Sequence, residues 1–277
     1  MITNLKLWFE SLRSTLTNLR ALGIFIALYA LLLASFYFFI STREATVWQV
    51  LLTYALLLLL PAEFFVFQAA ILEFARARKF AVKNILLSAL KLAAVTIPVL
   101  IIGALLWWLM NKLQARFPAT PAPLVFPPAP KAPPTHWPTL LLTTLRFVLF
   151  GVALPLATIH LWIEASVCDV RASFAGGARN VFGTIGRALA RAFSSESVFV
   201  YGLGLILFVL GPYLILLPRL TFTGTKTAFT LFVVQVIVAL VLMLIGWVVT
   251  LVTLARASAS DEPVESKAPA TVAESTA

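Results

Sequence analysis

Apolar residues occur along this chain in long uninterrupted runs, not at the spacing of two or 3.6 residues that marks a single buried face of a strand or helix. A transmembrane helix needs about 20 mostly apolar residues to cross about 30 Å of hydrocarbon. Within residues 21–255 we therefore predict an all-α fold, a polytopic membrane helix bundle of about six transmembrane helices. The predicted spans lie near residues 21–40, 47–72, 85–110, 140–165, 198–217 and 228–254.

Two more polar segments have their apolar residues at helical spacing. In residues 1–20 the apolar side chains share one helical face, and the charged ones fall mainly elsewhere. The connector 166–197 repeats this pattern, and its arginines Arg179, Arg187 and Arg191 lie off the apolar stripe. Such segments are typical of amphipathic helices at a membrane surface, so we predict two interfacial helices and expect the three arginines to face anionic lipid headgroups.

Two segments outside the spans are not expected to form a hydrophobic core of their own. Residues 117–138 are rich in proline, which predicts an extended external loop. The third span ends before this loop at Trp107 and Trp108, aromatic residues typical of a membrane interface. Residues 256–277 are mainly Ala, Ser, Thr and acidic, and predict a disordered cytoplasmic tail.

The composition excludes a water-soluble globular protein. Apolar residues make up 61% of the 277 positions and charged residues only 12%, whereas soluble domains have about 45–50% and about 25%. A fold in water would have no polar surface sufficient to cover so much apolar side chain. We therefore expect membrane lipids to surround most of the chain.

The formal charge of +10 is distributed as a topology signal. Lys and Arg cluster at the ends of the apolar runs, with no basic stripe carrying interleaved aromatics, so we expect no nucleic-acid partner. With the N-terminus in the cytoplasm, thirteen Lys and Arg residues lie in the inner segments and six in the outer ones. The positive-inside rule thus favours both termini in the cytoplasm. The layout resembles that of many bacterial polytopic proteins, so we expect the bacterial inner (cytoplasmic) membrane.

Polar groups within the spans are the candidates for function, because they are costly in hydrocarbon. Glu63 in the second span and Lys91 in the third differ in depth by about 6 Å at 1.5 Å per residue, which predicts an ion pair across a helical hairpin. The alternative is a transport role, with Glu63 coupling proton or cation movement. Arg146 and Gln235 form a second candidate pair, although Arg146 could equally reach headgroups or cap carbonyls.

Two residues near the cytoplasmic end of the fourth span are candidates for a metal site. His160 and Glu164 are four apart on one helical face, but a metal needs further ligands, so the spacing favours a local hydrogen bond. Cys168 is the only cysteine and excludes a disulfide within the chain. Motifs of hydrolases, nucleotide-binding loops and zinc peptidases do not occur. We therefore expect no catalytic residues, no metal and no cofactor.

These patterns predict a non-catalytic membrane scaffold or partner-binding subunit. Its partners would be membrane lipids and either another membrane protein or a second copy of the chain. The alternative is a small transporter or permease subunit in which Glu63 and Lys91 line a path through the bundle.

Overall fold

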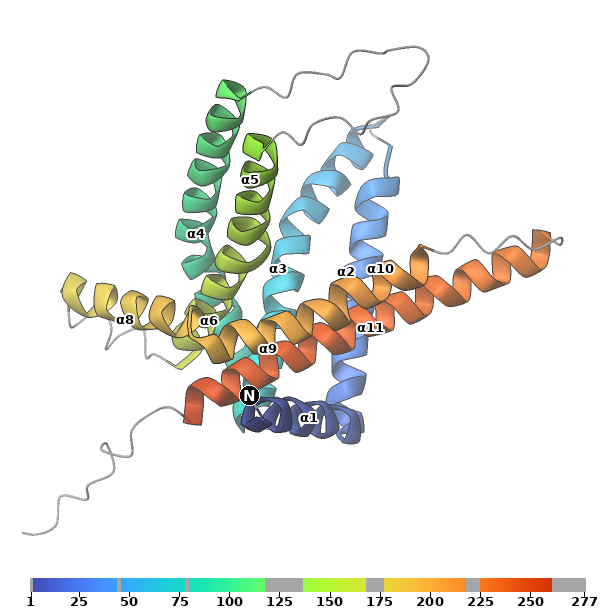
Figure 1. The fold of residues 1–277 in the computed structure, drawn as a ribbon. Coiled ribbons are helices and arrows are strands. Elements are labelled where there is room, and N and C mark those ends of the chain that lie inside the picture. The colour runs from blue at the N-terminus through green and yellow to red at the C-terminus, as the bar shows by residue number, and fades with distance from the viewer. Residues whose placement is uncertain are drawn as a thin grey trace, which may run out of the picture.

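The computed structural model describes residues 2–43, 46–77, 80–117, 137–167, 177–217 and 225–260. Within these ranges every regular element is helical and no strand occurs (Figure 1). Six helical segments are long and apolar enough to cross a membrane. The prediction of an all-α chain with six candidate membrane spans is therefore confirmed.

The N-terminal half contains one short helix and three long ones, and the long helices contain the first three predicted spans. α3 and α4 extend beyond the predicted spans. Each has an arginine in its last turn, where the helix dipole stabilises a cation. The four elements are α1 (Ile2–Thr17), α2 (Leu19–Ser41), α3 (Val47–Ala77) and α4 (Val82–Arg116).

In the C-terminal half the fourth and fifth spans are each composed of three helical pieces. The sixth span is one helix, and α8 precedes the fifth span. The elements are α5 (Trp137–Arg146), η1 (Phe147–Ala153), α6 (Leu154–Val167), α8 (Gly177–Ala192), α9 (Ser195–Leu205), η2 (Ile206–Leu210), α10 (Gly211–Leu216) and α11 (Thr225–Ser260).

The two π-helical pieces η1 and η2 have the same local cause. Each ends two residues before a proline, Pro155 or Pro212. A proline ring clashes with the carbonyl four residues back and removes one N–H donor. The turn widens instead, and the Leu154 N–H donates to the Leu149 carbonyl five residues back. An equivalent bond closes η2, so both spans stay helical through their prolines.

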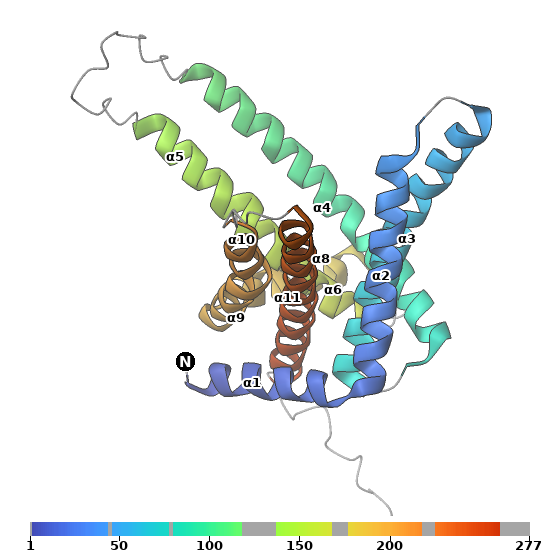
Figure 2. The same cartoon turned by 90° about the vertical axis from the view of Figure 1, so that its right-hand side faces the viewer.

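The long helices form three arms that meet at one end and spread apart toward the other (Figure 2). The arms are α2 with α3, α4 with the α5–η1–α6 run, and the α9–η2–α10 run with α11. Most of the buried apolar side chains belong to one cluster, to which all three arms contribute. Phe25 of α2 and Phe74 of α3, for example, pack edge to face there with ring centroids 5.5 Å apart. This shared core positions everything described below.

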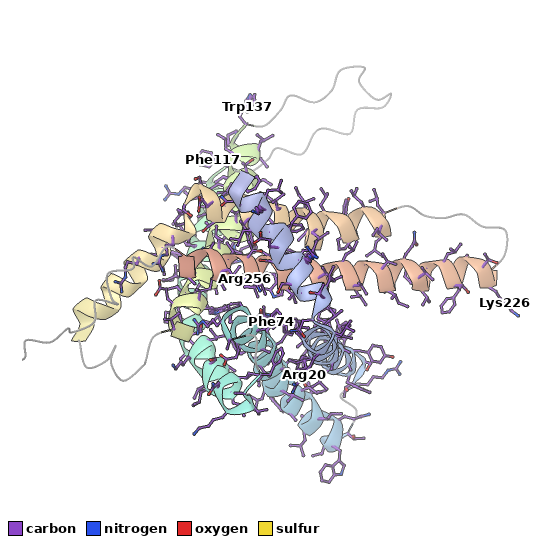
Figure 3. All side chains as sticks on the ribbon, turned by 90° about the horizontal axis from the view of Figure 1, so that it is seen from below. Arg20, Phe74, Phe117, Trp137, Lys226 and Arg256 are labelled. Carbon is purple, nitrogen blue, oxygen red and sulfur yellow. The ribbon has the colours of Figure 1, made fainter. Side chains whose placement is uncertain are left out.

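The first and last helices of the described chain meet at this common base. α1 crosses α11, as seen from below in Figure 3. The Arg256 guanidinium of α11 donates to the Ser11 hydroxyl at 3.3 Å and the Ser14 hydroxyl at 3.1 Å. Ser11 and Thr15 are buried in this contact, while Phe9 on the other side of α1 is exposed. The interfacial position of α1 remains a prediction.

The composition predicted a tail that begins at residue 256, but the helix extends past this position. α11 continues to Ser260 because Arg256 is held by α1 and Ala255 and Ser258 are buried. The rest of the predicted tail, 261–277, lies outside the described residues. The same holds for most of the predicted external loop 117–138 and for residues 168–176 of the connector 166–197.

Candidate functional site

Glu63 is held by the first hairpin. Its Oε1 accepts a hydrogen bond of 3.0 Å from the Ser35 hydroxyl of α2. Its Oε2 is buried and has no hydrogen-bond partner among the described residues. The structure thus places this carboxylate toward α2, whereas the predicted pair with Lys91 requires α4, on which Lys91 is half-buried.

Arg146 at the end of α5 has its partners on α4. Its Nη2 donates to the Asn111 Oδ1, and its guanidinium carbon lies 4.8 Å from the centroid of the Trp107 ring. Gln235, its predicted partner, belongs to α11 in a different arm and is half-buried there. The structure therefore does not bring this predicted pair to one site.

One of the three arginines of the connector, Arg191, differs from the expectation. Arg191 donates to the Glu164 Oε1 at 2.6 Å, and the two side chains are only 28% and 14% exposed. Arg191 therefore ties α8 to α6 instead of extending to headgroups. Arg187 is exposed on α8, and the Arg179 side chain lies outside the described residues.

A second arginine fixes the end of α6. Arg76 of α3 donates to the carbonyls of Ile163 and Ser166 and to the Ser166 hydroxyl, with a distance of 2.8 Å to the Ile163 oxygen. The last carbonyls of a helix have no partner within it, and a cation beside them is favoured by the helix dipole. Arg76 and Arg191 therefore both secure α6 at the base, which is a structural role.

His160 and Glu164 do not form the local pair that their spacing predicted. Glu164 binds Arg191, while His160 is buried and its Nε2 has no hydrogen-bond partner in the part of the chain that the structure describes. No group of three His, Cys, Asp or Glu side chains suited to a metal ion occurs among the residues described. His160 is instead buried in α6.

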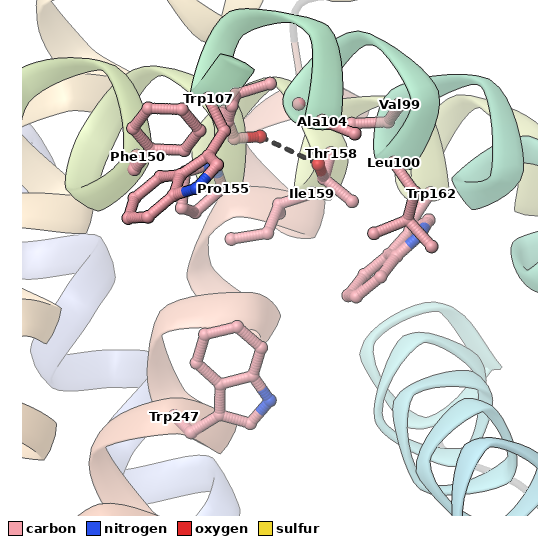
Figure 4. A pocket seen from close by; sticks show the side chains of 12 residues that line it. Val99, Leu100, Ala104, Trp107, Phe150, Pro155, Thr158, Ile159, Trp162 and Trp247 are labelled. Carbon is pink, nitrogen blue, oxygen red and sulfur yellow. Dashed lines mark hydrogen bonds between the residues drawn. The ribbon is translucent and has the colours of Figure 1, made fainter. Parts of the chain in front are cut away.

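A cavity of about 510 Å³ lies between α4, the η1–α6 run and α11 (Figure 4). This volume is within the range of about 300–1,000 Å³ typical of ligand sites. The lining contains one hydroxyl, that of Thr158, and it donates to the Leu154 carbonyl of its own helix at 2.7 Å. The cavity is thus an apolar space with aromatic walls. Its rings are Trp107, Phe150, Trp162 and Trp247.

Two of these rings are fixed by hydrogen bonds outside the cavity. The Trp162 Nε1 donates to the Thr96 hydroxyl at 2.8 Å, and the Trp247 Nε1 donates to the Gln68 Oε1 at 2.8 Å. A buried indole needs such a partner for its N–H, and its ring is then free to present an apolar surface. The Trp107 ring packs edge to face on Phe150, with centroids 5.5 Å apart. The walls are therefore preformed.

Sequence reasoning did not find this cavity. The sequence pattern predicts Trp107 at a membrane interface and indicates no role for Trp162 and Trp247. Two signals were present: Gly103, which lies one turn before Trp107 and leaves room beside α4, and Pro155, which marks the widened turn opposite. Hydropathy does not reveal which faces of two spans meet, so these signals gain meaning only from the fold.

No protein-family model, no curated protein and no solved structure matches this chain. What the chain does must therefore be inferred from its own residues.

Proposed function

We propose that this chain is a non-catalytic membrane subunit that binds a partner within the bilayer, either another membrane protein or a second copy. We place it in the bacterial inner membrane with both termini in the cytoplasm. The observation that carries the proposal is the separation of the intramembrane polar residues. Glu63 is held at the α2–α3 contact, Arg146 at the α4–α5 contact, and Gln235 lies on α11.

A transport path needs polar groups that converge on one opening. The described cavity is lined by none of the four predicted polar residues, and its walls are apolar. The Glu63 and Arg146 side chains instead form hydrogen bonds with neighbouring helices. This distribution supports a scaffold, in which polar residues within the membrane hold neighbouring helices together.

The spread of the arms supports a partner in the membrane. The arms separate from one another toward the far end (Figure 2), and many of their large apolar side chains are not covered by the described chain. Large apolar side chains are exposed in all three arms, for example Leu58 on α3, Leu105 on α4 and Phe229 on α11. A partner helix packed between two arms would cover them by van der Waals contact.

Site-specific photocrosslinking tests this proposal. A photoreactive phenylalanine analogue is placed singly at Leu58, Leu105 or Phe229, with the buried Leu92 as the control position. We expect one discrete protein adduct from at least one arm, identified by mass spectrometry, and none from Leu92. Adducts with lipid alone at all three exposed positions would contradict a partner between the arms.

One observation favours the transporter alternative, namely the buried Glu63 Oε2 without a hydrogen-bond partner in the described chain. An ionisable group in a span is a candidate for proton coupling. Proteoliposomes carrying a trapped pH-sensitive dye and an imposed pH gradient distinguish the two functions. Proton flux above that of empty liposomes, lost in Glu63→Gln and retained in Glu196→Gln, would establish the alternative. Flux equal to that of empty liposomes supports the scaffold.

A further inference from the structure

The described cavity is elongated along the helices. Its lining runs along α4 from Val99 to Trp107 and along the η1–α6 run from Phe150 to Trp162. At 1.5 Å per residue these stretches are about 12 Å and about 18 Å long. Half of the hydrocarbon core, about 15 Å, is the depth that one acyl chain of a lipid occupies. The cavity therefore has the length of a single acyl chain lying parallel to the spans.

One end of this cavity carries positive charge. Arg146 lies over the Trp107 ring that forms part of the wall, at 4.8 Å from its centroid, and binds Asn111. One residue further along α4, the Lys112 Nζ lies 5.8 Å from the Trp108 centroid. A guanidinium has five N–H donors, so the bond to Asn111 leaves others for a ligand.

No negative charge opposes these cations on the two helices that carry them. Neither α4 nor α5 contains an acidic residue along its described length. Arginine and lysine beside an apolar groove recognise a phosphate whose hydrocarbon tail enters the groove. The Trp107 ring lies in the cavity wall beneath Arg146, and Trp107 and Trp108 are aromatic residues typical of the level where headgroup meets hydrocarbon.

We propose that the cavity binds one acyl chain of an anionic phospholipid, whose phosphate is held by Arg146 and Lys112. The positive charge at one end favours the phosphate, and the apolar cavity beside it has the length of one acyl chain. The assignment goes beyond the proposed partner binding and does not depend on it, because each is tested by its own measurement, photocrosslinking for the partner and lipid titration for the cavity.

Native mass spectrometry of the full chain in mild detergent tests the headgroup first. The chain is titrated with dioleoyl phosphatidylglycerol and, separately, with dioleoyl phosphatidylcholine, which has the same chains and no net charge. We expect one equivalent of phosphatidylglycerol to bind, and phosphatidylcholine to bind several-fold more weakly. Inorganic phosphate should not displace the bound lipid, because it has no chain to occupy the cavity.

Variants then separate the phosphate from the acyl chain. Arg146→Gln should weaken phosphatidylglycerol binding roughly fivefold, the share of one cation near an anionic lipid, and leave phosphatidylcholine binding unchanged. Arg116→Gln is the matched control, an exposed arginine at the same end of α4. Gly103→Leu should reduce binding of both lipids, because a Cβ at Gly103 already lies 3.7 Å from Leu154 across the cavity. Gly23→Leu is its control, since no atom lies within 4 Å of a Cβ there.

A second filling variant, Ala104→Leu, and thermal melting of each variant show whether the loss reflects the cavity or misfolding. Equal binding of the two lipids by the unaltered chain would overturn the proposal. So would unchanged phosphatidylglycerol binding in folded Gly103→Leu and Ala104→Leu. Displacement by inorganic phosphate would reduce the site to an anion site, and displacement by a polyprenyl phosphate at lower concentration would assign it to another lipid; either result overturns the acyl-chain assignment.

Discussion

At the scale of single residues, the fourth span shows how a proline is accommodated in hydrocarbon. Pro155 has no N–H, so the Gly151 carbonyl four residues before it loses its usual partner. The hydroxyl of Tyr201, a residue 3% exposed on α9, donates to that carbonyl at 3.1 Å. Backbone groups within a bilayer must be satisfied by protein, because no water is present to do so. Tyr201 thus joins two arms through the group that the proline sets free.

Tyr201→Phe should lower the free energy of unfolding by about 1 kcal/mol, because it leaves the Gly151 carbonyl without its donor. Tyr37→Phe, at a residue 67% exposed on α2, is the control and should be neutral. The measurement is the thermal midpoint in detergent.

A double-mutant cycle with Pro155→Ala makes the test specific. Alanine restores an N–H opposite the Gly151 carbonyl, so Tyr201→Phe should cost less in that background. An identical cost in both backgrounds would show that the hydroxyl acts through some other contact.

The pair of Glu164 and Arg191 is the second prediction at this scale. Glu164→Gln should destabilise the chain by about 1 kcal/mol, because the ion pair is more shielded than a surface pair. In the Arg191→Gln background the same change should have almost no effect. Glu10→Gln on the exposed side of α1 is the control. Additive effects of Glu164→Gln and Arg191→Gln, measured by thermal melting, would show that the pair contributes no stability.

At the scale of elements, the close approach of α11 to η2 depends on Gly246. A Cβ at this position would lie 2.8 Å from the Phe208 Cβ and 2.9 Å from its backbone nitrogen. A side chain can turn away, but the backbone of η2 cannot. Small residues commonly serve this purpose where two helices meet in a membrane.

Gly246→Ala should therefore destabilise the α9–η2–α10 and α11 arm by about 1–3 kcal/mol, the usual cost of overpacking. Gly202→Ala is a matched control on α9, because nothing lies within 4 Å of its Cβ. There the better helix propensity of alanine should leave stability unchanged or raise it. Equal thermal midpoints for the two variants would show that η2 moves aside at little cost.

The sequence predicts where the membrane helices lie along the chain better than it predicts which helices pack against one another. Hydropathy locates six spans because each crossing needs a long apolar run. It does not state how each span is rotated about its axis, and one residue changes the facing direction by about 100°. Glu63 is at a depth that suits either α2 or α4, and only packing selects Ser35. Glu164 and Arg191 are 27 residues apart and meet because α8 folds back onto α6. The cavity depends on three spans at once, so no local pattern predicts it.

At the scale of the whole molecule, α1 closes the base that the three arms share. α1 packs against α11, which also contacts α3, α6 and α9. The bonds from Arg256 to Ser11 and Ser14 join residues more than 240 positions apart. They bring α1 and the last turns of α11 to one side of the molecule, as an even number of membrane crossings between them requires.

This arrangement makes a topology experiment decisive. In a Cys168→Ser background, single cysteines are placed at the exposed Lys6 and Ala259 near the base, and at the exposed Gln114 at the far end of α4. A membrane-impermeant maleimide should label Lys6→Cys and Ala259→Cys in inside-out vesicles, and Gln114→Cys in intact cells from which the outer membrane has been removed. Labelling of Lys6→Cys and Ala259→Cys from opposite sides would require an odd number of crossings. That result is incompatible with the Arg256 bonds, because a guanidinium on one side of a bilayer cannot reach hydroxyls on the other across about 30 Å of hydrocarbon.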